Sequence, residues 1–230
     1  NPRGMSRFWR AAETAPATGA SLELDAHSLW QPSGDRVMAA LPGGRGIVLG
    51  DPSGHVHFLP VGAGLEEVRA TDDDVSFIGH SAEVSLLSYD RAGDFVASVA
   101  TDNSIRIWNV ATEQPLPYAV DIDGHGVSAM VFSPSGQMLA IQKGTGLLLL
   151  NVANGSTVGE FELGEASNAL AFAADDRIYA GGASGVLKTI KRDNESAWSM
   201  QQLWRGPRAI RRLEASPRGD FLVMVDDQGR

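Results

Sequence analysis

The chain of 230 residues is 43% hydrophobic, which is enough to bury the core of a single domain. Its formal net charge of −9 argues against a nucleic-acid partner, because acidic side chains repel a phosphate backbone. The absence of cysteine excludes disulfides, thiol catalysis and cysteine-bound zinc; it leaves the compartment open, with the cytoplasm favoured over the periplasm. No apolar run is long enough to cross a bilayer, so we expect no direct membrane contact.

Short strands separated by turns are predicted along the chain in sets of four, lettered a to d. The best-defined set has strand a at 127–132, strand b at 137–142, strand c at 147–152 and strand d at 157–163. These segments are rich in Val, Ile and Leu, and the breaks between them hold Gly, Pro, Asn and Asp. Strand c recurs as Met5–Trp9, His55–Leu59, Ile105–Trp108 and Val186–Ile190. No helical period competes with this pattern, so an all-β fold is predicted.

Two markers return with each set of strands. A turn glycine stands at Gly44, Gly93, Gly136 and Gly219, with Asp176 in the equivalent place, and strand c ends on a bulky residue. The spacing of about 40–50 residues is typical of four-stranded antiparallel propeller blades. We therefore predict one β-propeller with about five repeat units. Four complete units are expected at residues 35–76, 77–120, 121–164 and 165–203. Two partial units, which together make a fifth, are expected at residues 1–30 and 204–230.

The two ends of the chain fall at the same phase of this repeat. The first unit holds only strands c and d plus a long loop, and the last holds only strands a and b. We therefore expect the chain to be a piece of a larger propeller protein; the alternative is a complete five-bladed ring in which the two ends together form one blade.

The second complete set of strands resembles the WD40 repeat. Gly79-His80 matches the family's Gly-His pair, Asp102 matches its turn aspartate, and Trp108-Asn109 matches its terminal Trp-Asp. The next set keeps Gly124-His125 but has Leu150-Asn151 in place of Trp-Asp. The resemblance implies a divergent WD40-like propeller, of the kind found in larger bacterial proteins.

In WD40 repeats a histidine, the turn aspartate, a hydroxyl on strand b and the tryptophan form a hydrogen-bonded chain inside the blade. The resemblance thus implies structural roles for His80, Asp102 and Trp108, and for His125 in the next blade. The hydroxyl is expected two residues before the aspartate, where the sequence has Ala100, so the chain is predicted to be incomplete.

No motif typical of an active site is present: a nucleophile elbow, a Walker loop and a His-Glu-x-x-His pattern are all missing. Gly181–Gly185 lies between predicted strands and is interpreted as a hairpin turn, because a phosphate loop precedes a helix. Asp72–Asp74 lacks the spacing of a calcium loop and is interpreted as a solvated loop. His55 and His57 share a face of strand c, but no third metal ligand is evident near them. We therefore expect no enzyme activity, metal or cofactor.

The resemblance places partner-binding residues at the end of the propeller where strands a begin. The candidates are Glu83, Ser85, Thr101, Ser128, Lys143 and Arg211. Four arginines fall close together in the same region: Arg205, Arg208, Arg211 and Arg212. A guanidinium grips carboxylates and phosphates, so this segment is interpreted either as a contact for an acidic peptide or as ordinary solvated arginines.

The resemblance implies a non-catalytic platform that docks a protein partner or another domain of the same chain. An alternative is a propeller that senses a ligand or peptide and is attached to a membrane transporter or a signalling NTPase. A propeller hydrolase or lactonase would need carboxylates and histidines from several blades around a metal, and the repeats carry no acid at a common phase. Fold alone does not choose between these functions.

Overall fold

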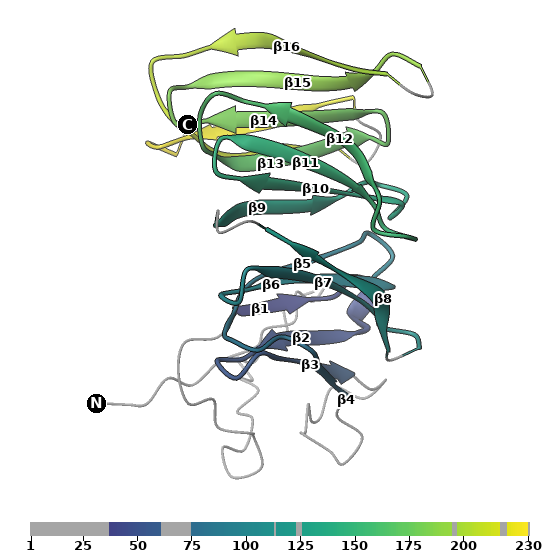
Figure 1. Cartoon of the computed structure of the whole chain (residues 1–230). Helices are drawn as coiled ribbons and strands as arrows, with labels where there is room; N and C mark the ends of the chain where they lie inside the picture. Colours follow the sequence, from purple (N-terminus) through teal and green to yellow (C-terminus); the bar gives the residue numbers. More distant parts are fainter. Residues whose placement is uncertain are drawn as a thin grey trace, which may run out of the picture.

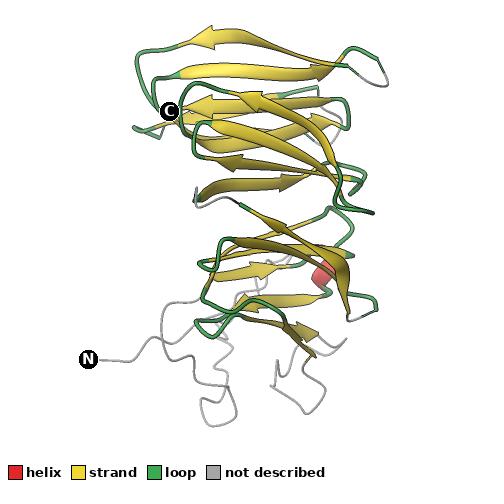
Figure 2. Cartoon of the chain, in the orientation of Figure 1, coloured by secondary structure: helices red, strands yellow, loops and turns green. Residues whose placement is uncertain are grey.

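The computed structural model describes residues 37–60, 75–112, 114–122, 126–194, 197–216 and 220–229. In these ranges all regular structure is strand, apart from one 3-10 turn, η1 (Pro42–Gly44) (Figure 2). Four features predicted from the sequence lie outside the described residues: the strand at Met5–Trp9, Asp72–Asp74, His125 and Gly219. Over the ranges described, no helix is long and apolar enough to span a membrane.

In the described ranges the strands form four antiparallel sheets of four strands and one sheet of two, each paired in chain order, and these sheets are blades 1 to 5. Blade 1 contains β1 (Val37–Ala40), β2 (Gly46–Gly50), β3 (His55–Pro60) and β4 (Val75–Ile78). Blade 2 contains β5 (Val84–Tyr89), β6 (Phe95–Ala100), β7 (Ser104–Asn109) and β8 (Gln114–Asp121). Blade 3 contains β9 (Val127–Phe132), β10 (Met138–Lys143), β11 (Gly146–Asn151) and β12 (Thr157–Glu162). Blade 4 contains β13 (Ser167–Ala174), β14 (Arg177–Gly182), β15 (Val186–Arg192) and β16 (Trp198–Arg205), and blade 5 contains β17 (Ile210–Ala215) and β18 (Leu222–Asp226).

The blades are stacked one after another, which confirms the predicted all-β fold of four-stranded blades (Figure 1). The first strand of each blade, strand a, contacts strand a of the next along the whole series β1, β5, β9, β13 and β17. One direct link is the Ser128 hydroxyl on β9, which donates to the carbonyl of Ser167 on β13 at 2.6 Å. The strands a therefore lie side by side and form one common edge of the stack.

Two of the expected unit boundaries fall inside strands. β4 runs to Ile78, which pairs with His55, so the first blade does not end at residue 76. β16 runs to Arg205, which pairs with Val186, so the fourth blade does not end at residue 203. In both blades strand d stays hydrogen-bonded to strand c up to its last residue, and the chain leaves the sheet only afterwards.

The turn between strands a and b of blade 3 shows how the turn residues set the register. Gly136 has φ 73°, a conformation that disfavours other residues, and its N–H donates to the carbonyl of Ser133 at 2.9 Å. The hydroxyl of Ser133 accepts the N–H of Met138 at 3.1 Å, which starts β10 at that residue. The N–H of Ser135 donates to Asp175 of blade 4 at 3.0 Å. The predicted turn at Gly136 is confirmed, and it also holds neighbouring blades together.

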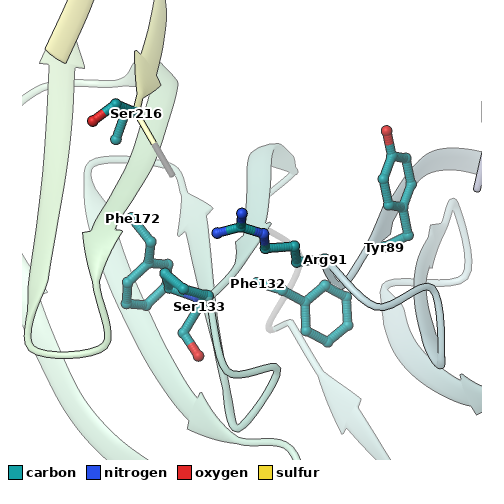
Figure 3. Close-up of a pocket in the computed structure, with 8 residues that line it drawn as sticks. Tyr89, Arg91, Phe132, Ser133, Phe172 and Ser216 are labelled. Atoms are coloured by element: carbon teal, nitrogen blue, oxygen red, sulfur yellow. The ribbon is translucent and has the colours of Figure 1, made fainter. Parts of the chain in front are cut away.

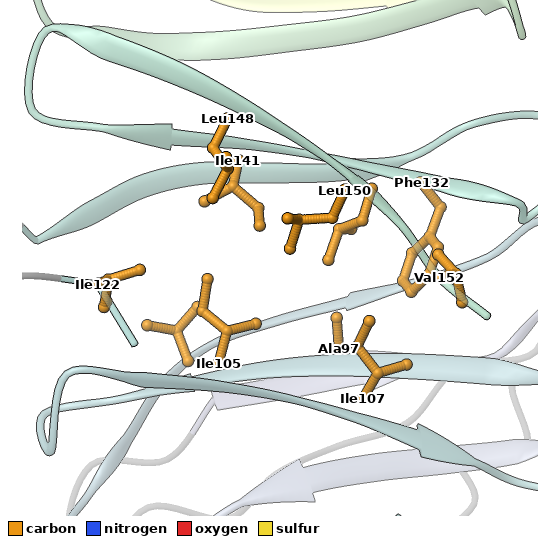
Figure 4. Close-up of a cluster of buried hydrophobic side chains, with 11 residues drawn as sticks. Ala97, Ile105, Ile107, Ile122, Phe132, Ile141, Leu148, Leu150 and Val152 are labelled. Atoms are coloured by element: carbon orange, nitrogen blue, oxygen red, sulfur yellow. The ribbon is translucent and has the colours of Figure 1, made fainter. Parts of the chain in front are cut away.

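The core lies between the blades. Ala97, Ile105 and Ile107 project from blade 2 towards Leu148 and Leu150 of blade 3, and all are buried (Figure 4). The opposite face of blade 3 packs on blade 4 in the same way. Because both faces of a blade are covered, its inner strands are apolar throughout instead of alternating. Each fully buried Leu or Ile contributes roughly 1.5–3 kcal/mol relative to exposure.

Candidate functional site

A chain of buried hydrogen bonds crosses blade 2. The indole Nε1 of Trp108 donates to Ser98 Oγ at 2.8 Å, and Ser98 Oγ lies 2.7 Å from Nε2 of His80. On the other side of the ring, Nδ1 of His80 lies 2.8 Å from Ser104 Oγ. The Ser104 hydroxyl in turn donates to Oδ1 of Asp102 at 2.7 Å. These hydrogen bonds connect β6, β7, the turn between them and the loop that precedes β5.

One proton assignment gives each group in this chain a donor or an acceptor. The Ser98 hydroxyl donates to Nε2 of His80, and Nδ1–H of His80 donates to Ser104. The imidazole is then neutral. Burial lowers the pKa of His80 below its ordinary value, although the Asp102 carboxylate, 3.4 Å away, acts in the opposite direction. The histidine is thus committed to internal hydrogen bonds.

The carboxylate of Asp102 is held by donors on both oxygens. The N–H of Ser104 donates to Oδ1 at 3.0 Å, and the N–H of Ser81 donates to Oδ2 at 2.7 Å. Burial alone would raise the pKa of Asp102, but the Ser104 hydroxyl and these two amides outweigh it and lower the pKa to about 2. Asp102 therefore fixes the turn between β6 and β7 against the segment that enters β5.

The expectation that the hydrogen-bonded chain of blade 2 lacks a hydroxyl from strand b is wrong. The hydroxyl comes from Ser98, which lies one strand period before Ala100 on the same face of β6. Ala100 instead ends β6, and its carbonyl accepts the N–H of Asn103 in the following turn at 3.2 Å. Ser104 is a second hydroxyl that the sequence analysis missed, although a serine two residues after a turn aspartate is a recognisable signal.

Each blade has turns at both ends of its strands, and the corresponding ends of all blades lie on the same side of the stack. At the b–c end, strands a begin and the turns between strands b and c lie, for example residues 101–103. At the a–b end, strands a finish and the turns between strands a and b lie, for example residues 133–137.

A pocket of about 260 Å³ opens at the a–b end and was not predicted from the sequence. It is lined by the ends of four neighbouring strands a and their turns: Tyr89, Arg91, Phe132, Ser133, Pro134, Phe172, Ala215 and Ser216. The rings of Phe132 and Phe172 are buried in its walls, and Tyr89 is 39% exposed. Figure 3 shows the guanidinium of Arg91 reaching across the space between these walls. This a–b pocket combines apolar ring surface with one cation.

Solved structures have the same arrangement of blades. A chain in the crystal structure of the mitotic checkpoint complex superposes with a TM-score of 0.63 and 21% identity, over 80% of this chain and 59% of that one. The β-propeller domain of Cps50 (Swd1) from Myceliophteria thermophila superposes with a TM-score of 0.62 and 16% identity, over 83% of this chain and 62% of that one. Residues 74–109 match the family model for the WD domain, G-beta repeat. Residues 74–109 thus contain a WD40 repeat, and the chain has the β-propeller fold of these solved structures.

The family match runs from the start of β4 to the end of β7, and it includes all five residues of the hydrogen-bonded chain. The chain spans 59% and 62% of the lengths of the two solved chains. No curated protein sequence gives a significant match to it.

The residues expected to contact a partner lie at the b–c end of the propeller. Glu83 and Thr101 are exposed and adjacent, since the N–H of Thr101 donates to the carbonyl of Glu83 at 2.8 Å. The Ser85 hydroxyl donates to the carbonyl of Val99 at 3.3 Å. In blade 3, Lys143 pairs with Val127 in the ladder, next to Ser128. The structure thus places these residues in two groups on neighbouring blades.

The arginine segment is divided. Arg208 lies 3.9 Å from both Asp226 and Asp227, and Nε of Arg212 donates to Glu214 at 2.7 Å. These two arginines neutralise carboxylates of blade 5. Arg205 and Arg211 are exposed and form no ion pair with any carboxylate in the described ranges. Within this segment, therefore, Arg205 and Arg211 are the two arginines that no carboxylate of the described residues already pairs with.

Replacing Asp102 by alanine is expected to cost about 1–3 kcal/mol of unfolding free energy at neutral pH, because buried donors lose their acceptor. Its folded pKa of about 2 lies below the ordinary 3.8, so the contribution is complete above about pH 4 and fades as the pH falls towards 2. Urea unfolding of the wild type and the variant should therefore converge over that interval.

Asp94→Ala is the matched control for this experiment. Asp94 is an aspartate of the same blade that forms an ion pair with Arg45. Its side chain is 48% exposed, so its loss should cost less than about 1 kcal/mol. Equal losses in the two variants, or a difference that does not change with pH, would contradict the structural role of Asp102.

Proposed function

We propose that this propeller is a non-catalytic docking platform for a protein partner, or for another domain of its own chain, and that the a–b pocket receives a partner's side chains. The supporting observation is that one cavity is lined by residues from four blades. No single blade contains the site, so binding depends on the assembled stack. The similarity to a chain that is part of the mitotic checkpoint complex agrees with a protein partner.

The lining of the a–b pocket defines the chemistry of its occupant. Phe132 and Phe172 offer apolar ring surface, and the Arg91 guanidinium lies over it. A short segment with an apolar or aromatic side chain beside a carboxylate is complementary to this surface. Arg91 also brings a positive charge to this pocket on a chain of net charge −9, which favours acidic segments there.

The size of the pocket weighs against the small-molecule sensor. A cavity of about 260 Å³ is smaller than the roughly 300–1,000 Å³ of ordinary ligand sites. It holds one or two side chains but leaves most of a larger ligand exposed. A peptide sensor attached to a transporter or NTPase would use the same contacts as the platform and would differ only in the response that binding triggers.

The buried hydrogen bonds of His80 argue against a hydrolase active site. His80 has a fully buried side chain that bonds to two serines, so it cannot accept a proton from a substrate. We assign structural roles to His80, Asp102 and Trp108 for this reason, and extend the same role to His125 by its place in the repeat.

The b–c end is proposed as a second contact surface for a large partner. This surface comprises Glu83, Ser85, Thr101, Ser128, Lys143 and the arginine segment. Within the arginine segment Arg205 and Arg211 are the contact candidates, because Arg208 and Arg212 are already paired with carboxylates.

Peptides selected from a random displayed library on the wild-type chain provide the test. We expect a consensus with a carboxylate beside an apolar side chain, and an affinity that falls by about tenfold or more in Arg91→Ala, the scale of one charged hydrogen bond. The loss should shrink at high salt, since screening weakens the wild-type contact. Fluorescence anisotropy with a labelled peptide measures both effects.

Arg205→Ala with Arg211→Ala is the control, because it removes two exposed arginines at the opposite end of the stack. This variant should bind the selected peptide as the wild type does. A loss confined to the b–c variant would move the docking site to that end, and selected peptides that neither variant affects would refute both surfaces.

A further inference from the structure

Blade 1 holds three metal-ligating side chains at its b–c turn. Asp51 follows β2, and His55 and His57 share one face of β3, where alternate residues point the same way. Nε2 of His57 lies 3.1 Å from Oδ2 of Asp51, and Nδ1 of His55 lies 3.6 Å from the same oxygen. The three ligand atoms are all within 4.8 Å of one another. The expectation that the two histidines lack a third ligand is wrong, because the turn folds Asp51 back beside them.

The two oxygens of Asp51 have separate tasks. Oδ1 accepts the N–H of Ser53 at 2.9 Å, the Ser53 hydroxyl at 2.7 Å and the N–H of His55 at 2.9 Å. Oδ2 faces the two imidazoles instead. Burial alone would raise the pKa of Asp51, but the Ser53 hydroxyl, His57 and the turn amides outweigh it and hold the pKa well below its usual range. The orientation of the carboxylate is therefore fixed by donors to Oδ1, which a metal at Oδ2 would not displace.

The propeller fold does not require these three side chains. The b–c turns of blades 1, 2 and 4 each contain a left-handed residue whose N–H donates to the carbonyl three residues earlier: Gly54, Asn103 and Gly185. Counted from that residue, the positions of Asp51, His55 and His57 are occupied in blade 2 by Ala100, Ser104 and Arg106, and in blade 4 by Gly182, Val186 and Lys188. Blades 2 and 4 form the same turn without an imidazole or carboxylate at these positions. The same turn in blade 5, at Gly229, has Asp226 at the position of Asp51, so among these four turns it is the two histidines that are particular to blade 1.

We propose that Asp51, His55 and His57 form a binding site for a divalent transition-metal ion of the zinc class. Two imidazole nitrogens and one carboxylate oxygen suit this class, whereas magnesium and calcium prefer oxygen ligands. A tetrahedral zinc ion with bonds of about 2.0–2.1 Å needs ligand atoms roughly 3.3 Å apart. The two observed nitrogen–oxygen distances of 3.1 and 3.6 Å lie on either side of that value.

One side-chain rotation completes the site. The side chain of His55 is 37% exposed, so it can turn to bring its nitrogen closer to that of His57, and the ion can enter from solvent. The side chains of Asp51 and His57 are only 8% and 15% exposed and form a fixed base. Three protein ligands leave one coordination position open, for water or for a ligand from a docked partner. The site lies at the b–c end, where the carbonyl of Asp51 also accepts the N–H of Val84 in blade 2 at 3.1 Å.

Calorimetric titration of the chelator-treated chain with zinc chloride tests the site. We expect one ion per chain and no binding of magnesium or calcium. His57→Ala and Asp51→Asn should each weaken zinc binding by at least about 100-fold, since loss of a ligand exceeds the roughly 10–100-fold effect of losing an outer partner. Asp51→Asn keeps an oxygen acceptor for the turn donors, so it separates loss of the ligand from loss of the turn, and circular dichroism checks that both variants fold.

Asp94→Ala is the control, because it removes a carboxylate that is paired with Arg45 and does not belong to the cluster, and zinc binding should be unchanged in it. Cobalt(II) gives a second readout: the wild type should develop the intense visible bands of a tetrahedral ion, and His57→Ala should not. Absence of stoichiometric zinc binding, or binding that survives in both His57→Ala and Asp51→Asn, would overturn the proposal.

Discussion

Replacement of Trp108 by alanine is expected to lower the free energy of unfolding by about 3–5 kcal/mol, the range for removing a buried aromatic side chain. Trp108 is fully buried, and its ring stacks on Phe77 of blade 1 with centroids 5.2 Å apart and planes at 30°. It belongs to the core cluster that joins blades 1 and 2. The variant thus opens a cavity at a blade interface, where surrounding strands are fixed by their own ladders and cannot collapse into it.

The indole also supplies a hydrogen bond, and a second variant separates this contribution from the packing. Trp108→Phe keeps most of the ring but removes the N–H that Ser98 accepts, and is expected to cost about 1–2 kcal/mol. Trp204→Ala is the control, because that ring is 43% exposed and its loss should cost less than about 1 kcal/mol. Urea unfolding ranks the three variants. A cost for Trp108→Ala no larger than that for Trp204→Ala would contradict this packing.

The blades could be predicted from the sequence because their signals are local. Strand a of blade 3 is expected at residues 127–132, which are the bounds of β9, since a Gly turn and a run of apolar residues identify it without reference to the other blades. The expected ends of two strands d are wrong although a local signal is present. β4 and β16 stop where pairing with strand c stops, and Gly79 and Gly206 follow their last residues directly, whereas the expected boundaries at residues 76 and 203 lie two residues earlier.

The hydrogen-bonded chain and the metal cluster depend on which residues each b–c turn brings together, and the sequence specifies this less directly than it specifies the strands. Counting back from Asp102 puts the hydroxyl of the hydrogen-bonded chain at Ala100, but Ala100 is the last residue of β6, and it is Ser98, two residues earlier, that contacts the tryptophan. The same kind of turn brings Asp51 beside His57, six residues away. The a–b pocket is less predictable still, because Tyr89, Phe132 and Phe172 come from three blades and meet only once the stack has formed.

Replacing Gly185 by alanine is expected to destabilise the propeller by more than about 2 kcal/mol, through backbone strain and a clash together. Gly185 lies in the b–c turn of blade 4 with φ 79°, where a side chain is disfavoured. A Cβ there would lie 2.4 Å from the carbonyl oxygen of Arg208 and 2.5 Å from that of Gly206. Both atoms are backbone, so the connection from β16 to β17 would have to move, and the 2.9 Å hydrogen bond from Gly206 N–H to the Gly185 carbonyl with it.

Gly164→Ala isolates the clash from the strain. Gly164 has a similar φ of 74°, but no heavy atom lies within 4 Å of the position that its Cβ would take. It should therefore cost only the backbone part, about 1 kcal/mol. The excess loss in Gly185→Ala, measured by urea unfolding, reports how tightly blade 5 is fitted against the turn of blade 4. Equal losses in the two variants would mean that the β16–β17 connection yields freely; Arg205 and Arg208 would then not be held in fixed positions for a partner.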